Sequence, residues 1–200
     1  MARNNKRGFV PHKHIAGNAA FVTRRYHVSS NNSTAIFAGD PVELNVNGHV
    51  QVIDTSGVSA NELPILGIVG QVLDVNQRPL THNLPSTGNF LNASTEGYVD
   101  VYDDPGIIFL VNVDATGKQA DIGMFIQTTA GSANSSAGIS GFQLKGSTAV
   151  ASSVGHRFQV MRVGSNQLDG VDSFDGTFQD YEVRIANHQW NRTWNRVGSK

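Results

Sequence analysis

The chain has 200 residues, a formal net charge of −1, only 16% charged residues and no cysteine. The lack of cysteine excludes disulfides and cysteine-based zinc or iron–sulfur sites. No apolar run approaches the ~20 residues that span a bilayer, and no apolar stretch of signal-peptide length follows the basic start, so we expect folding in a cytoplasm and no membrane partner.

Charge is distributed unevenly along the chain. Six basic residues and no acid precede Asp40, and four basic residues and no acid follow Glu182. The segment between them holds all 16 acids and five bases, so the three regions carry +6, −11 and +4. Basic ends on an acidic body suit docking onto the acidic bodies of neighbouring copies, onto nucleic acid or onto an acidic partner, although solvated tails also fit.

The first 25 residues show neither the period of two of a strand nor the period of about 3.6 of a helix, and we predict an extended basic arm over residues 1–25. Apolar residues such as Ile15, Phe21 and Val22 indicate that the arm becomes ordered by lying on its own core or on a neighbour. The residues of the arm that we expect at an interface are Arg3, Lys6, Arg7, Phe9, Lys13, Arg24 and Arg25.

Strands are expected from residue 26 onward. The stretch PVELNVNGHVQV, residues 41–52, alternates apolar and polar residues on both sides of Asn47-Gly48, the strongest short hairpin signal, and Pro41 marks a strand start. Residues 64–75 are apolar on both faces, which predicts a buried strand in which Gly67 and Gly70 form bulges or points of close approach.

The rest of the body reads as strands separated by loops. Residues 76–96 form a polar loop of unusual length, for which we expect a contact between subunits. A second hairpin is predicted over residues 97–113, with its turn at Asp103–Gly106. Further strands are predicted over residues 121–128, 142–144, 157–163 and 178–185, and loops over residues 129–141 and 166–177.

Together these patterns predict an all-β protein, an antiparallel β-sandwich or barrel over residues 26–185. The extended N-terminal arm precedes this body, and a C-terminal tail over residues 186–200 follows it. The long loop at 76–96 leaves open a division into two β subdomains.

Three clusters carry acidic or ligating side chains, and each has a simpler interpretation. His12-Lys13-His14 places two imidazoles on one side of a strand, but no further ligand is near, so a basic arm fits better than a metal site. The aspartates at 100–104 fit turn formers, and those at 169–175 lack the ligand spacing of an EF-hand loop.

Sequence motifs of the common enzyme classes are missing. There is no nucleophile elbow, phosphate loop, dinucleotide fingerprint or HExxH motif. We therefore predict a chain that is not an enzyme and that uses no cofactor and no metal.

The C-terminal tail carries two tryptophans, Trp190 and Trp194, among asparagines and arginines. Tryptophans are costly to leave in water, so we expect burial against a partner or a sister subunit in preference to self-packing. Trp190, Arg192, Trp194 and Arg196 complete the predicted interface.

Several of these stretches resemble virion proteins of tailed bacteriophages. The stretch GYVDVYDDPGIIFLVNVDA is followed by ADIG at Ala120–Gly123 and a Gly/Ser-rich loop. In that group a Val-x-Val-Tyr-x-Asp-Pro strand leads to a Phe-x-Val return and an Arg-Ile-Asn-x-His-like end, which match Val99–Pro105, Phe109–Val111 and Arg184–His188. The first hairpin followed by ILGIVGQV resembles phage head decoration proteins. The resemblance covers roughly residues 35–190 and does not include the arm.

The resemblance implies a non-enzymatic bacteriophage structural protein that binds and stabilises the capsid shell, as a decoration or cement protein. It would be assembled in the host cytoplasm into the capsid of the virion. Its implied partners are the major capsid protein and neighbouring copies of itself, as a homo-oligomer, without nucleic acid.

Two alternatives stay open: another virion component of the tail, connector or fibre, and a carbohydrate-binding β-sandwich. For the cement role, deletion of residues 1–25 is expected to abolish capsid binding and to leave the β signal in circular dichroism intact.

Overall fold

The computed structural model describes residues 7–17, 19–55, 64–80, 90–152, 156–163 and 179–191. Its strands are β1 (Val10–His14), β2 (Arg24–Val28), β3 (Ile36–Phe37), β4 (Pro41–Leu44), β5 (Val50–Val52), β6 (Ile65–Leu73), β7 (Phe90–Leu91), β8 (Gly97–Tyr102), β9 (Ile107–Asn112), β10 (Phe125–Ile126), β11 (Thr128–Ala130), β12 (Phe142–Leu144), β13 (Phe158–Val163) and β14 (Asp180–Ile185). Its helical elements are the 3-10 turns η1 (Gln119–Asp121), η2 (Gly146–Thr148) and η3 (Gln189–Asn191). No helix in this part of the chain is long and apolar enough to cross a membrane.

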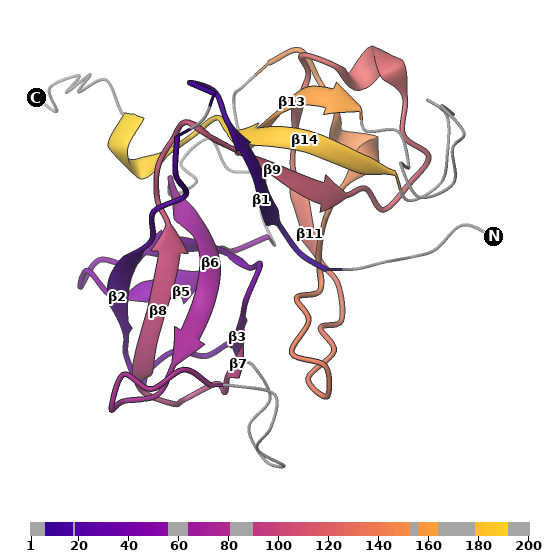
Figure 1. Cartoon of the computed structure of the whole chain (residues 1–200). Coiled ribbons are helices and arrows are strands. Elements are labelled where there is room, and N and C mark those ends of the chain that lie inside the picture. The colour runs from indigo at the N-terminus through magenta and orange to yellow at the C-terminus, as the bar shows by residue number, and fades with distance from the viewer. Residues whose placement is uncertain are drawn as a thin grey trace, which may run out of the picture.

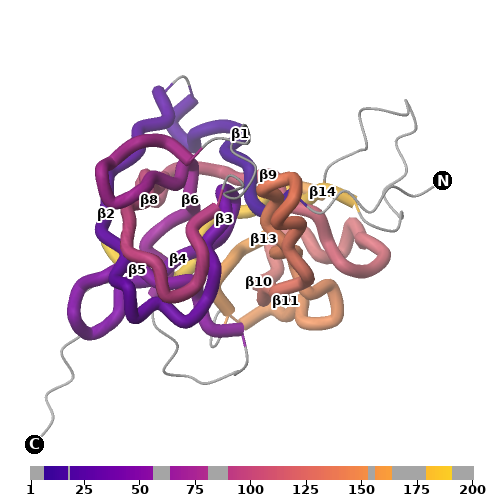
Figure 2. Tube along the Cα trace, turned by 90° about the horizontal axis from the view of Figure 1, so that it is seen from below, coloured from indigo at the N-terminus to yellow at the C-terminus, as the bar shows by residue number. Residues whose placement is uncertain are grey.

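Most of the strands form two antiparallel sheets of five strands each (Figure 1). Sheet A has the order β1-β9-β14-β13-β10 and sheet B the order β2-β8-β6-β4-β5, while β3–β7 and β11–β12 form two-stranded pairs. Seen from below, the strands of the two sheets lie beside each other (Figure 2). The predicted all-β antiparallel fold is confirmed, and the arrangement in two sheets is compatible with a β-sandwich.

The strand β6 is buried on both faces because it takes part in two cores. Ile65 and Ile68 pack in a core shared with the inner face of sheet A. Leu66, Val69 and Val72 pack in a second core enclosed by sheet B. The strand predicted to be buried from its two apolar faces is therefore confirmed, and it is the element that joins the two sheets.

Two glycines let β6 lie close to β8. A Cβ atom at Gly67 would lie 2.2 Å from the carbonyl oxygen of Tyr102, and one at Gly70 would lie 2.6 Å from the Tyr102 ring. The pairing of β6 with β8 shifts register between Val69 and Gln71, on either side of Gly70. Both glycines are required for close approach, as predicted.

The predicted hairpin at residues 41–52 is also confirmed. β4 and β5 pair antiparallel, with Pro41 as the first residue of β4. The side-chain oxygen of Asn45 accepts hydrogen bonds from the backbone N–H groups of Asn47 and His49, at 2.9 and 3.0 Å. Gly48 has a φ of 77°, whereas Asn47 does not have a positive φ, so the hairpin forms without the type I′ turn in which both central residues have φ > 0.

The strands β8 and β9 do not pair with each other. β8 lies between β2 and β6 in sheet B, whereas β9 lies between β1 and β14 in sheet A. The turn Asp103–Gly106 therefore carries the chain from one sheet to the other, and the hairpin predicted over residues 97–113 is wrong. Burial decides the partners, because Val101 packs in the core of sheet B and Phe109 in the shared core.

The first 25 residues, as far as they are described, belong to the β body. β1 is the edge strand of sheet A on β9, and β2 is the edge strand of sheet B on β8. Phe9 is 2% exposed and stacks on Phe158, with ring centroids 4.6 Å apart. The segment is ordered by its own core, so we no longer expect its deletion to leave the β structure intact.

Other predicted stretches differ in detail. The predicted strands at 142–144, 157–163 and 178–185 are confirmed as β12, β13 and β14. Residues 121–128, predicted as one strand, hold the end of η1, the strand β10 and the start of β11. In the predicted loop 76–96, β7 pairs with β3, while residues 81–89 lie outside the described part, as do residues 166–177.

Candidate protein interface

The turn between β8 and β9 forms a corner on which the N-terminal segment is fixed. The backbone N–H of Ile15 donates to the carbonyl oxygen of Gly106 at 2.9 Å, and Nε2 of His14 lies 3.3 Å from the carboxylate of Asp104. The backbone N–H of Gly106 also donates to Asp104, at 2.8 Å. This hydrogen bond, more than the one with His14, lowers the pKa of Asp104 and keeps it an anion.

Asp103 and Asp100 hold the start of β2 at the same corner. The buried carboxylate of Asp103 accepts hydrogen bonds from Nη1 of Arg24 at 3.1 Å and from the hydroxyl of Tyr26 at 2.5 Å. Burial, with the contact to Asp103, raises the pKa of Tyr26 to about 12, so the hydroxyl keeps its proton. Arg25 donates twice to Asp100, at 2.8 and 3.0 Å.

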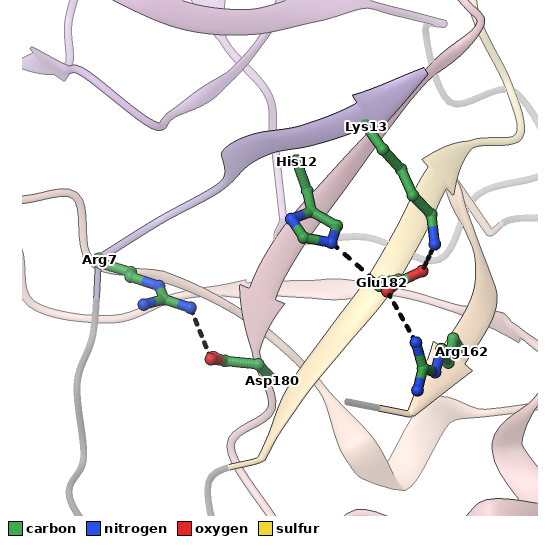
Figure 3. A network of polar contacts seen from close by, with 6 residues as sticks. All are labelled: Arg7, His12, Lys13, Arg162, Asp180 and Glu182. Atoms are coloured by element: carbon green, nitrogen blue, oxygen red, sulfur yellow. Dashed lines mark hydrogen bonds and ion pairs between the residues drawn. The ribbon is translucent and has the colours of Figure 1, made fainter. Parts of the chain in front are cut away.

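A second network fixes β1 on the outer face of sheet A (Figure 3). Side chains alternate along β14, so Glu182 points away from the shared core. Its carboxylate pairs with Lys13, and it lies 3.6 Å from Nε2 of His12 and 3.8 Å from Nη1 of Arg162. The Glu182 side chain is only 5% exposed, so a carboxylate largely removed from water ties Lys13 of β1 across β9 to β14.

The described cations of the predicted interface are all paired within the chain. The pairs are Arg7 with Asp180, Lys13 with Glu182, Arg24 with Asp103 and Arg25 with Asp100. Each of these four cations therefore has a carboxylate partner within its own chain, and the expectation that they lie at an interface stays a prediction. Phe9 is unavailable to a partner, since it is buried in the core. The remaining predicted residues Arg3, Lys6, Arg192, Trp194 and Arg196 lie outside the described part of the chain.

Large apolar side chains stay exposed around the corner. Ile15, Phe21 and Val22, between β1 and β2, are 60, 39 and 62% exposed, and Trp190 on η3 is 52% exposed. Phe21 contacts Tyr102 at the end of β8, with ring centroids 6.4 Å apart. We call Ile15, Phe21, Val22 and Trp190 the corner surface.

His188 ties η3 to the corner. It is 1% exposed, pairs as an isolated bridge with Ile65, and accepts the backbone N–H of Trp190 at Nδ1, at 3.1 Å. Burial lowers the pKa of His188 to about 4, against the opposing effect of Asp103 and Asp104. The imidazole is therefore neutral at pH 7, and it fixes the backbone of Trp190 while that residue stays half exposed. The sequence predicts a buried Trp190, but the described residues of its own chain leave it half exposed.

In the described ranges, no group of three or more His, Cys, Asp or Glu side chains is arranged to hold a metal ion. His12 and His14 face different carboxylates, those of Glu182 and Asp104, instead of a common point.

A groove of about 600 Å³ lies between residues 29–37, the β4–β5 hairpin and residues 130–142. Its lining is rich in Asn, Ser and Thr. The two phenylalanines in that lining, Phe37 and Phe142, are only 7 and 5% exposed. They therefore present little ring surface on which a sugar would stack.

The chain matches no protein-family model, no curated protein and no solved structure.

The acidic partners of the arm were not predicted from the sequence. In the sequence, Glu182 stands out only as the last acid before the basic C-terminal tail. A signal was present in the strand DYEVRI, where Glu182 stands between Tyr181 and Val183, two residues that face the core. A carboxylate at the centre of such a strand needs a cation as its partner. The bases of the N-terminal segment, which have no acid near them in the sequence, can supply that cation.

Proposed function

We propose that the chain is a non-enzymatic structural protein of a tailed-bacteriophage virion, which binds and stabilises the capsid shell as a decoration or cement protein. The observation that carries the proposal is the corner surface, four large apolar residues that are 39–62% exposed on the β1–β2 connection and on η3. The resemblance to phage virion proteins supports the class of the protein, and the corner surface supports the way it docks.

Large exposed apolar side chains on segments that are held firmly by their own chain favour binding to another protein. Single exposed apolar residues are ordinary, whereas a group of them marks an interaction surface. Each square ångström of apolar surface removed from water contributes about 25 cal/mol. One such contact is weak, but the same contact repeated over a shell lattice by neighbouring copies gives strong holding by avidity.

The ion pairs of the N-terminal segment support this docking indirectly. The described residues of the segment 15–23 are flanked on one side by the pairing of Lys13 with Glu182 and on the other by the pairing of Arg25 with Asp100. A segment held in its binding conformation loses less conformational entropy when it docks. The cations thus position the docking segment, while the apolar side chains between them contact the partner.

The proposal is tested by co-sedimentation of the purified chain with capsid shells that lack it. The variant Val22→Ser removes part of the corner surface, and Val75→Ser is its matched control, because the two valines are 62 and 54% exposed. Val75 follows β6 at the end away from the corner. Loss of about 1 kcal/mol of apolar burial should weaken each contact of Val22→Ser roughly fivefold.

The expected result is shell binding by the wild type and by Val75→Ser, with weaker binding by Val22→Ser and by Trp190→Ser. Binding should also persist in high salt, because apolar contacts are not screened as exposed ion pairs are. No shell binding by the wild type, or equal binding by Val22→Ser and Val75→Ser, would overturn the proposal. Binding to isolated tails in place of shells would assign the chain to another virion component.

A further inference from the structure

The two outer strands of sheet B, β2 and β5, are not paired with each other in the described sheet, yet two histidines join them. His27 stands on β2 and His49 directly precedes β5. Their Nδ1 atoms lie 3.0 Å apart, and their ring centroids lie 4.9 Å apart with an interplanar angle of 63°. The pair therefore bridges the open side of the sheet with a single hydrogen bond between imidazoles.

A carboxylate determines where the protons of this pair lie. Oε1 of Glu96 is 2.9 Å from Nε2 of His27, and a carboxylate only accepts, so Nε2 of His27 carries a hydrogen. When His27 is neutral, its Nδ1 is an acceptor and Nδ1–H of His49 donates to it. One added proton is accommodated if His27 donates from Nδ1 to a neutral His49, with Glu96 beside the new charge.

A second added proton cannot be accommodated. Both Nδ1 atoms would then carry hydrogen and face each other at 3.0 Å, and two like charges would stand at the same place. Glu96 faces His27 from the residue before β8 and can compensate one of the two charges. Tyr98 faces His27 from β8, with ring centroids 5.4 Å apart, and it supplies no charge in acid.

We propose that His27, His49 and Glu96 form a pH-sensitive clasp, which joins β2 to β5 near neutral pH and opens in acid, when both imidazoles become charged. The stability that it contributes is present at neutral pH and is lost in acid, because the second proton has no place in the closed arrangement. Opening releases the outer edge of β2, the strand that follows the docking segment 15–23. An acid-induced loss of shell binding follows only if the proposed function is right, whereas the clasp itself does not depend on it.

The clasp is tested by amide hydrogen exchange of β2 and β5 in the full chain, corrected for the intrinsic effect of pH. From about pH 7.5 to about pH 5, wild-type exchange at these strands should rise. The rise should reach about tenfold per pH unit for each extra proton that the open form binds, until most molecules are open. In His49→Gln a neutral amide replaces the second imidazole, so this rise should disappear. His12→Gln is the matched control on sheet A and should keep the rise.

No rise in the wild type, or the same rise in His49→Gln, would overturn the clasp. Shell co-sedimentation of the same proteins separates the two proposals. If wild-type binding falls in acid while His49→Gln stays bound, both are supported. If the exchange results appear but no protein binds shells at any pH, the clasp stands and the proposed function fails.

Discussion

Replacing Phe9 by alanine tests whether the N-terminal segment is part of the fold or a detachable arm. Phe9 is 2% exposed and stacks on Phe158, with ring centroids 4.6 Å apart and an interplanar angle of 21°. Its backbone N–H donates to the carbonyl oxygen of Gly39 at 2.9 Å. A detachable arm would lose contacts without unfolding the body, whereas an embedded segment loses a core side chain.

The expected loss of stability is large. Truncation of a buried phenylalanine costs about 3–5 kcal/mol, and the stacked partner places Phe9 toward the upper part of that range. A domain is stable by about 5–15 kcal/mol in total. The neighbouring Val10 is 38% exposed, so Val10→Ala is a matched control that should cost about 0.5 kcal/mol or less.

The assay is urea unfolding of both variants followed by far-ultraviolet circular dichroism. Phe9→Ala should shift the unfolding midpoint strongly downward at an unchanged slope, and Val10→Ala should overlay the wild type. A free energy of unfolding for Phe9→Ala within about 1 kcal/mol of the wild type would refute the embedded segment. So would an equal loss in the two variants.

Burial raises the pKa of Asp40 from the usual 3.8 to about 7, so the folded chain keeps a proton that the unfolded chain has lost. Stability should therefore fall as the pH rises from about 4 to about 7. In urea unfolding, Asp40→Asn should no longer show this fall in stability. The same fall in the variant as in the wild type would contradict the role of Asp40. Gly67→Ala places a Cβ 2.2 Å from the Tyr102 carbonyl oxygen. The variant should lose about 3 kcal/mol of unfolding free energy, measured by thermal or urea unfolding. An unchanged stability would mean that the two strands can separate freely. Glu182→Gln leaves Lys13 without its carboxylate and should cost about 1–3 kcal/mol, less than a fully buried pair because Lys13 is 45% exposed. Amide exchange at β1 should rise in that variant, and unchanged exchange would argue against the anchor.

Local signals in the sequence predicted the elements whose structure depends on a few adjacent residues. The Asn47-Gly48 turn, the strand start at Pro41 and the close approach at Gly67 and Gly70 all follow from backbone chemistry within one or two residues. The alternation of apolar residues likewise predicted β13 and β14. The turn and the strand start do not depend on which strand lies beside which, whereas the close approach of Gly67 and Gly70 is to Tyr102 of the neighbouring strand β8.

The errors concern pairing between distant segments. The turn Asp103–Gly106 has the same chemistry in a hairpin and in a crossover, so the sequence does not show that β9 pairs with β1 and β14. Arg25 meets Asp100 only because β2 pairs with β8. Without the strand order, a cluster of bases near one end looks free, although each described cation of the predicted interface has an acidic partner.

Under the proposed function, cryo-electron microscopy of the virion tests the central claim most directly. The account predicts many copies distributed over the capsid shell, with Phe21, Val22 and Trp190 against the major capsid protein and the Lys13–Glu182 pair intact within each copy. A chain confined to the tail, or one seated on the shell with the corner surface in solvent and its cations paired to the shell, would contradict it.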